Sequence, residues 1–297
     1  MKKGQMVCLC LKNKGSAVRF CLWPLMKNKI KYWYKKYTPN FFIKFLYILI
    51  NMNELIKIGL FNFEMREATS MSQLTWVYAN SSQADNIFIS KITKYINAAS
   101  LVDLKLDPIL EPDNSRQYEF EYKNMNSFPG EHYRILVGIT NFENFNNFTE
   151  IGTGSGIASK AILNKTNANI KTFDISPWNE KDSHLTKSEF NSSRLTQIIE
   201  DLANPKSFKK YSDLIINSDL ILLDADKSGT FENSLLTQIS KLDFDNKFKL
   251  LFIDDIRYFS MYKVWKRIKN PKVDLTSFGH WSGSGLVDIT NGLIYED

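Results

Sequence analysis

Acidic residues directly follow four short strand-like runs in the second half of the chain. The runs and their acids are 170–173 with Asp174, 196–199 with Glu200 and Asp201, 220–223 with Asp224, and 250–253 with Asp254 and Asp255. Helical patterns separate the runs, and such alternation predicts βαβ units on a parallel sheet. Ligands of open α/β sheets bind beyond the carboxyl ends of the strands. These carboxylates are therefore expected to meet on one rim of the sheet.

The remaining elements complete an α/β domain. Helices are expected at 133–139, 158–163, 232–241 and 258–268, a first strand at 148–151, and two last strands at 273–278 and 285–289. A turn rich in glycine and serine separates the last two strands, which predicts an antiparallel hairpin. The sequence thus predicts a mostly parallel seven-stranded sheet that ends in this hairpin.

Charge divides the chain into unequal parts. Residues 1–60 hold twelve Lys or Arg and one acid, Glu54, which is a formal charge of +11, so the total of +6 leaves −5 for the rest. The accessory part that follows has a helical pattern at 84–99. The three expected regions are a basic, aromatic and helical extension over 1–70, an accessory or cap region over 71–126, and the main domain over 127–297.

Composition also restricts partners and compartment. The three cysteines, Cys8, Cys10 and Cys21, support neither a disulfide framework nor a zinc site, and no secretory signal is convincing, so we expect a cytoplasmic protein. The apolar run 41–50 carries Lys44 and is too short to span a bilayer. Its basic surroundings leave two interpretations open: peripheral contact with an anionic membrane, or docking on the main domain or a second copy of the chain. No nucleic-acid motif accompanies the basic segment, so no specific nucleic acid is expected as a partner.

The first strand leads into a glycine-rich turn that follows Glu150. The turn residues are Gly152, Thr153, Gly154, Ser155 and Gly156. Glycine is needed where a strand turns sharply into a helix and the backbone approaches a ligand. The spacing is G-x-G-x-G, with Ile157 in place of the third glycine of a dinucleotide fingerprint. The preceding acid suits a cofactor with an ammonium group, and Asp174, eighteen residues after the last glycine, is placed to accept ribose hydroxyls.

The run from Glu150 to Gly156 resembles motif I of class I S-adenosylmethionine (SAM)-dependent methyltransferases, and motif order and strand ends agree over about residues 127–290. The resemblance implies a Rossmann-like fold and SAM as the cofactor. It also implies that Asp174 binds the ribose, Ile175 lies against adenine and Asp201 meets the adenine edge. The full set of residues expected at the cofactor is Glu150, Gly152, Thr153, Gly154, Gly156, Asp174, Ile175, Asp201 and Asp224.

A second motif, Leu223-Asp-Ala-Asp-Lys227, is similar to the Asp-Ala-Asp-Lys of cation-dependent catechol and caffeoyl-CoA O-methyltransferases. There the first Asp binds a divalent metal and the Lys acts near the acceptor hydroxyl, which implies these roles for Asp224 and Lys227. That family ends the next strand with Asp-Asn, whereas this chain has Asp254-Asp255. A consecutive Asp pair is similar to metal-dependent sugar O-methyltransferases of macrolide pathways. The resemblance thus implies O-methylation of a hydroxylated small molecule, a sugar or a glycan.

Asp224, Asp254 and Asp255 also predict a cation site on physical grounds. Neighbouring strands lie about 4.8 Å apart, and three carboxylates there would repel and raise a pKa unless a cation lay among them. Oxygen ligands suit Mg²⁺, Mn²⁺ or Ca²⁺, and Mg²⁺ is favoured. Ordinary salt bridges to Arg257 and Lys227 are the alternative. Lys227 is the candidate base, because burial and a nearby cation would both lower its pKa.

Three histidine-bearing segments complete the candidates. His280 and Trp281 lie in the turn between the last two strands, where they would serve as a base and a sugar-stacking platform, or simply form a hairpin turn. Residues 129–134 precede motif I and either line the pocket or fill an amphipathic helix, and His132 among them is a second candidate base. His184 lies in a polar loop with no evident companion.

The sequence therefore predicts a SAM-dependent O-methyltransferase that uses a divalent metal and a small-molecule or glycan acceptor. One alternative is a metal-independent methyltransferase with a nitrogen or carboxylate acceptor. Another is a non-catalytic SAM-fold subunit whose basic N-terminus binds an anionic surface, although the intact glycine turn and carboxylates count against it. A homo-oligomer is open in each case.

Overall fold

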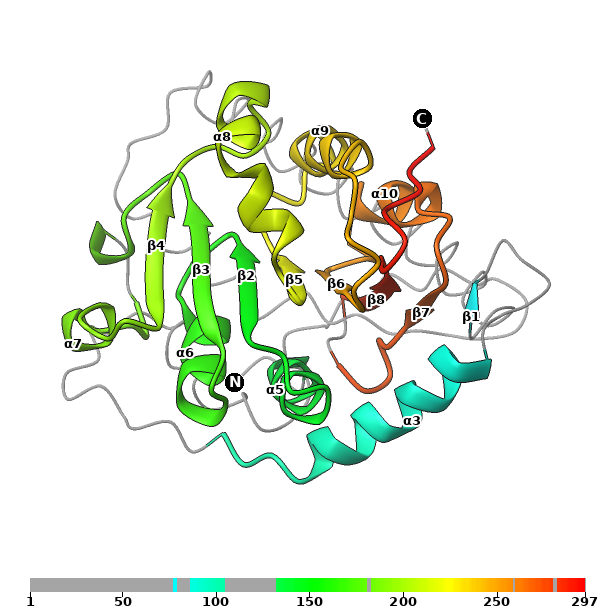
Figure 1. Cartoon of the computed structure of the whole chain (residues 1–297), viewed down its shortest axis with the longest axis horizontal. Helices are drawn as coiled ribbons and strands as arrows, with labels where there is room; N and C mark the ends of the chain where they lie inside the picture. Colours follow the sequence, from blue (N-terminus) through cyan, green and yellow to red (C-terminus); the bar gives the residue numbers. More distant parts are fainter. Residues whose placement is uncertain are drawn as a thin grey trace, which may run out of the picture. The chain divides into compact units, whose positions relative to one another are not determined.

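The computed structural model of the chain describes residues 77–78, 86–104, 132–180, 183–258, 260–279 and 282–296. The basic extension over 1–70 lies outside these residues, so the expected division into three regions stays a prediction. Within the described residues the strands form one sheet in the order β1-β7-β8-β6-β5-β2-β3-β4 (Figure 1).

The elements follow the alternation that the sequence predicts. The strands are β1 (Val77–Tyr78), β2 (Asn147–Ile151), β3 (Asn169–Asp174), β4 (Leu195–Ile199), β5 (Leu220–Leu223), β6 (Leu250–Asp254), β7 (Lys272–Asp274) and β8 (Ser284–Asp288). The helices are α3 (Asn86–Ser100), α5 (His132–Phe142), α6 (Ile157–Lys165), α7 (Lys187–Phe190), α8 (Pro205–Ile216), α9 (Thr230–Ile239) and α10 (Met261–Arg267), and Trp178–Glu180 form a 3₁₀ turn.

Pairing within the sheet confirms the predicted fold class. Strands β2 to β6 pair in parallel. Strand β8 is antiparallel to β6, and β7 is antiparallel to β8, which is the expected C-terminal hairpin. This is the Rossmann-like class I methyltransferase fold, with one addition: the two-residue strand β1 comes from the accessory region and pairs antiparallel with β7 as an eighth strand.

Both faces of the sheet are covered by helices, which explains why the central strands are apolar throughout. Successive residues of a strand point to opposite faces. Leu220 and Leu222 accordingly join a core with α3, α5 and α6, whereas Ile221 and Leu223 join a second core with α8, α9 and α10. Figure 1 shows these two sets of helices on opposite sides of the strands. The carboxyl ends of the strands are thereby fixed at a common rim.

Helix α8 and strand β7 differ from the prediction. Helix α8 was missed, although Asn204 and Pro205 are a helix-start signal, and the Asn204 Oδ1 accepts the Lys206 N–H at 2.9 Å. Strand β7 ends at Asp274, before the expected residue 278. The chain turns there because the Phe278 N–H donates to the Leu275 carbonyl at 2.8 Å.

The accessory helix α3 confirms the helical pattern at 84–99 and packs against α5. A Cβ added at Gly138 would lie 2.6 Å from the Ala99 nitrogen, so the two helices approach closely only because that residue is glycine. The Arg134 side chain donates to the carbonyls of Ala99 and Ser100 at 3.2 and 2.8 Å. This part of the accessory region is therefore packed on the helix that precedes the glycine turn.

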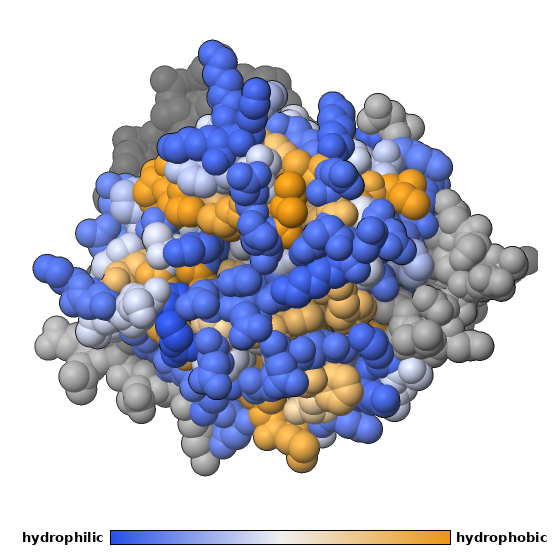
Figure 2. Space-filling view, viewed as in Figure 1, coloured by the Kyte–Doolittle hydropathy of each residue, from blue (hydrophilic) through white to orange (hydrophobic). Residues whose placement is uncertain are grey.

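No helix among the described residues is long and apolar enough to cross a membrane. On the face that Figure 2 shows, apolar side chains form small patches between hydrophilic ones. The apolar run 41–50 lies outside the described residues, so its contact with a membrane or a partner stays a prediction.

Candidate active site

The glycine-rich turn joins β2 to α6 at the carboxyl end of the sheet. Gly152, Gly154 and Gly156 have φ angles of 99°, 50° and 75°, in the left-handed region that glycine favours. A Cβ added at Gly152 would lie 1.9 Å from the Asp224 carbonyl oxygen, so only glycine fits there. The ends of β2 and β5 thus contact each other, and the turn lies beside the acidic motif.

Asp174 at the end of β3 holds the glycine turn. Its Oδ2 accepts the Gly154 N–H at 3.0 Å. Ile175 follows with 73% of its surface exposed, and Ile199, which pairs with Asp174 across β3 and β4, is 45% exposed. Asp201 is exposed just beyond β4. The residues predicted to bind ribose and adenine therefore lie at the ends of two paired strands. The apolar side chains there, Ile175 and Ile199, are exposed.

Glu150 is buried beneath the turn. Its Oε2 accepts hydrogen bonds from the Ser159 and Thr172 hydroxyls at 2.6 and 2.5 Å. Burial raises the pKa of the Glu150 carboxyl to about 8, although these hydroxyls lower it, and Asp224 adds to the rise. The carboxyl therefore holds its proton to higher pH than an exposed glutamate does, and a cation bound beside it would favour the ionised form.

A chain of hydrogen bonds extends from Glu150 toward the end of β3. The Thr172 and Thr153 hydroxyls are 2.7 Å apart, and the Gln197 amide donates to Thr153 at 3.0 Å. The side-chain carbonyl oxygen of Gln197 in turn accepts the backbone N–H of Trp178 at 2.9 Å. Thr153, a predicted cofactor residue, thus links the buried acid to Gln197 of β4, which sequence reasoning missed.

Three carboxylates converge where β5 and β6 end. These strands pair in parallel, and one oxygen each from Asp224, Asp254 and Asp255 lies within 4.8 Å of the other two. The side chains are 32%, 6% and 18% exposed, so the group is half-buried. The structure therefore brings together the three residues predicted to bind a metal.

The Lys227 Nζ lies among these carboxylates, and we call the four side chains the rim cluster. It is 2.6 Å from Asp224 Oδ1 and 3.1 Å from Asp255 Oδ2, with Asp254 Oδ2 at 3.8 Å. Burial lowers the pKa of Lys227, as expected, but the three carboxylates outweigh burial and hold this pKa above its ordinary range. Lys227 is therefore an ammonium ion in this arrangement, contrary to the lowered pKa expected from the sequence.

Both loops of the rim cluster have left-handed backbone. Lys227 and Asp255 have φ angles of 66° and 59°, which cost a residue with a side chain about 1–2 kcal/mol. The Glu232 carboxylate accepts the N–H groups of Lys227 and Gly229 at 2.7 and 2.8 Å. The Ser282 hydroxyl donates to Asp255 Oδ1. Sequence reasoning missed Glu232 and Ser282, although a glutamate in the first turn of a helix is a capping signal.

The alternative to a metal site was that the three aspartates form ordinary salt bridges to Lys227 and Arg257, and the structure agrees with it in part. Lys227 does pair with the carboxylates, but the Arg257 guanidinium pairs with Asp274 at 2.6 Å. The Arg257 N–H donates to the Ser282 carbonyl at 2.9 Å, so the turn of the hairpin is held to the rim. His280 and Trp281 of that turn lie outside the described residues, and their roles stay predictions.

A cavity of about 430 Å³ borders the glycine turn, the buried acid and the carboxylates. Its lining residues are His132, Tyr133, Glu150, Gly152, Thr153, Gly154, Ser155, Ile157, Ala158, Asp224, Ala225, Asp254 and Asp255. Two members of the segment 129–134 thus line the cavity, which agrees with one of the two interpretations of that segment. Asp174, Ile175 and Asp201 are not among the described lining residues. His184 is buried, and its backbone N–H donates to the Ser155 carbonyl at 2.7 Å.

No protein-family model matches the sequence, and no curated protein does. Solved structures do match. A SAH-bound methyltransferase from Podospora anserina is 15% identical, with 72% of this chain and 97% of that chain covered and a TM-score of 0.38. A putative caffeoyl-CoA O-methyltransferase from Staphylococcus aureus is 13% identical, with 76% and 99% covered and a TM-score of 0.37.

A short-chain dehydrogenase/reductase from Veillonella parvula in complex with NADP also matches. It is 19% identical, with 33% of this chain covered and a TM-score of 0.27, and the match spans 43% of that chain. All three TM-scores are below 0.5. What the chain does therefore has to follow from the residues of its own rim.

Proposed function

We propose that the chain is a SAM-dependent O-methyltransferase that requires a divalent cation. The observation that carries the proposal is a single cavity bordered by both the glycine turn and the carboxylates of Asp224, Asp254 and Asp255. A methyl donor held at the turn would thus lie beside a group of oxygen ligands. The proposed acceptor is a hydroxyl of a small molecule, a sugar or a glycan.

The glycine turn and its neighbours fit SAM. Glu150 lines the cavity as a buried acid whose ionisation a cofactor ammonium would favour. Asp174 places a carboxylate for ribose hydroxyls at the end of β3, where its two oxygens accept the backbone N–H groups of Gly154 and Ser176. Ile175 offers an exposed apolar surface to a flat base. Each part of the cofactor thus has a side chain of suitable chemistry.

The three carboxylates fit a hard divalent cation. Opposite oxygens around Mg²⁺ are about 4.2 Å apart, and those around Ca²⁺ about 5 Å apart, which agrees with oxygens within 4.8 Å of one another. A divalent cation held there would lower the pKa of an acceptor hydroxyl that binds to it. Asp224, Asp254 and Asp255 would hold it.

Lys227 would assist at the acceptor oxygen. As an ammonium ion it can stabilise the negative charge that develops when the hydroxyl proton leaves. It can accept that proton only when it is away from the carboxylates, because they hold its pKa high. In the transfer, the acceptor oxygen bonds to the methyl carbon, the methyl–sulfur bond breaks, and the hydroxyl proton passes to the enzyme or to solvent. Alignment of these three atoms is the main task of the site.

One observation favours a metal-independent methyltransferase as the second candidate. Lys227 already forms ion pairs with the carboxylates of Asp224 and Asp255. In that case the carboxylates serve to place an ammonium ion at the acceptor. The experiment that separates the two candidates screens sugar nucleotides, glycans and catechols as acceptors with labelled SAM, with and without EDTA. Methyl transfer would survive EDTA only if the enzyme is metal-independent.

Binding of the cofactor can be tested before an acceptor is known. Asp174→Ala should weaken SAM and S-adenosylhomocysteine binding by about 2–4 kcal/mol, roughly 30- to 1,000-fold, because it removes two charge-assisted hydrogen bonds. Isothermal titration calorimetry measures the loss, and Asp243→Ala, which changes an exposed acid next to Phe244, is the matched control. Unchanged affinity in the Asp174 variant would remove Asp174 from the cofactor site, and no SAM binding by the wild-type chain would refute the proposed function.

A further inference from the structure

The rim cluster has space for a single cation between its oxygens. Three oxygens that lie within 4.8 Å of one another enclose a small volume, and the Lys227 Nζ lies 2.6 to 3.8 Å from oxygens of the same three aspartates. A divalent ion would have to lie about 2.0–2.6 Å from those carboxylates. The ammonium and the ion therefore cannot occupy this position together.

The backbone of Lys227 is fixed, so only its side chain can leave. Glu232 is fully buried and accepts the Lys227 N–H at 2.7 Å and the Gly229 N–H at 2.8 Å. The lysine stem is flexible and has four carbons, and 13% of the side chain is exposed. An exchange of cations thus requires rotations of one side chain and no rearrangement of the loop.

Charge favours such an exchange. The three carboxylates carry a formal charge of −3 when ionised, and the Lys227 ammonium neutralises only one of these charges. Among these four side chains the formal charge is therefore −2 when the carboxylates are ionised, and Asp224, Asp254 and Asp255 border a cavity. A divalent cation compensates more of this charge than the ammonium does.

We infer that Lys227 is a resident counter-ion that competes with the divalent cation for the same three carboxylates. The inference rests on the metal site of the proposed function. It makes cation binding and the release of Lys227 toward the acceptor a single event. It also assigns Glu232 the role of a positioning residue, which keeps the lysine backbone in place in both states.

The test measures Mn²⁺ binding to the full chain by electron paramagnetic resonance. Lys227→Met removes the competing charge and keeps the length of the side chain, so it should bind Mn²⁺ roughly tenfold more tightly than the wild type. Lys227→Arg keeps the charge and should bind no more tightly than the wild type. Lys247→Met is the matched control, because Lys247 also pairs with a buried aspartate, Asp219, at 2.6 Å, and its affinity should equal that of the wild type.

A second measurement follows the lysine itself. Titration of the wild type with Mg²⁺ should shift the ¹³Cε and ¹⁵Nζ resonances of Lys227 and leave those of Lys247 in place. Mn²⁺ affinity in Lys227→Met that is equal to or weaker than the wild-type value would overturn the competition while the metal site stands. If neither the wild type nor Lys227→Met binds Mn²⁺, both the competition and the metal dependence of the proposed function are refuted.

Discussion

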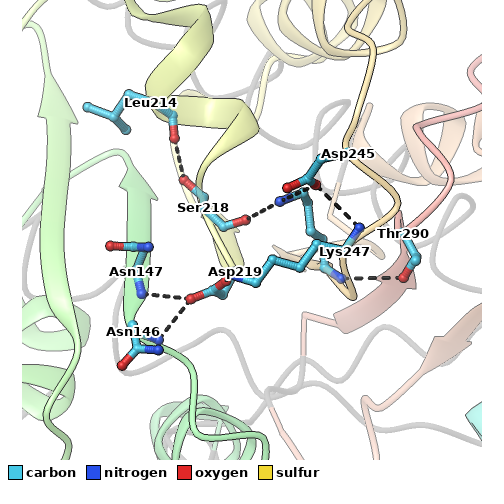
Figure 3. Close-up of polar contacts among 9 residues, drawn as sticks. Asn146, Asn147, Leu214, Ser218, Asp219, Asp245, Lys247 and Thr290 are labelled. Carbon is cyan, nitrogen blue, oxygen red and sulfur yellow. Dashed lines mark hydrogen bonds and ion pairs between the residues drawn. The ribbon is translucent and has the colours of Figure 1, made fainter.

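Lysines and aspartates form clusters at both ends of β5 and β6, and the two clusters differ in balance. At the amino ends lies a base cluster, drawn in Figure 3. Its charged members are Asp219, Asp245, Lys247 and Lys249. Two acids meet two lysines there, whereas the rim cluster has three acids and one lysine. The same kinds of side chain thus form a neutral group at one end of the sheet and a negative group at the other.

Hydrogen bonds make the same distinction. Asp219 is 1% exposed and accepts the N–H groups of Asn146 and Asn147 at 2.8 and 2.9 Å, besides the Lys247 ammonium at 2.6 Å. Lys249, also 1% exposed, lies 3.1 Å from Asp245 Oδ1. These groups connect the start of β5 to the start of β2. In a balanced cluster the loss of one partner leaves a buried group uncompensated and destabilises the fold, whereas an unbalanced cluster beside a cavity is suited to bind a ligand.

The largest expected effect lies at the rim. Asp254→Asn keeps the shape of the side chain and removes one negative charge, so turnover of an acceptor found by screening should fall by roughly a thousandfold, the size of several kcal/mol of metal assistance. Mn²⁺ binding should weaken in parallel, and SAM affinity should stay the same. Asp245→Asn, which changes a base-cluster acid, should affect none of these quantities. Full turnover by Asp254→Asn would show that the two clusters do not differ in function.

The next effect concerns stability at the other end of the sheet. Asp219→Ala leaves the N–H groups of Asn146 and Asn147 without their acceptor, which should lower the free energy of unfolding by about 3 kcal/mol. Urea unfolding measures the change. Lys247→Ala should cost under about 1 kcal/mol, because that side chain is 55% exposed. A loss of SAM or Mn²⁺ binding in folded Asp219→Ala would contradict a purely structural role for the base cluster.

Much of the sheet was predictable because its signals are local. An acid directly after an apolar run marks the end of a strand, so the convergence of Asp224, Asp254 and Asp255 followed from strand order alone. The glycine turn was visible for the same reason: at Gly152 a positive φ and the close carbonyl of Asp224 both require glycine. Helix α8 was also within reach, since Asn204 precedes a proline.

The contacts inside the site were not predictable in this way. Whether the pKa of Lys227 is lowered or raised depends on the distances of 2.6 to 3.8 Å from its Nζ to three aspartates at the ends of β5 and β6. Spacing along the chain does not fix those distances. Ser282 contacts Asp255 across 27 residues, and no pattern near either residue indicates the pair. Three-dimensional packing decides such contacts.

The smallest expected effect compares a buried rim acid with its counterpart at the base. Glu150 is held by hydroxyls and has no ion pair within the described residues, whereas Asp219 has Lys247. The folded pKa of Glu150 is about 8, above the ordinary value of 4.5. The folded state therefore binds more protons than the unfolded state between these values, so this group's contribution to stability is lost as pH rises from about 4.5 to 8.

Glu150→Gln removes this dependence. Its free energy of unfolding relative to the wild type should rise by about 2 kcal/mol between pH 5 and pH 6.5, as measured by urea unfolding at each pH. Saturating SAM should reduce the pH dependence of the wild type, because an ammonium beside Glu150 favours its ionised form and lowers its pKa. Glu143→Gln is the control, since that glutamate is also largely buried but lies away from the rim and has an ion-pair partner, Lys91, at 3.2 Å. A difference between Glu150→Gln and wild type that stays constant across this pH range would show that Glu150 is ionised without a ligand, and the rim would then hold a further negative charge for a cofactor to compensate.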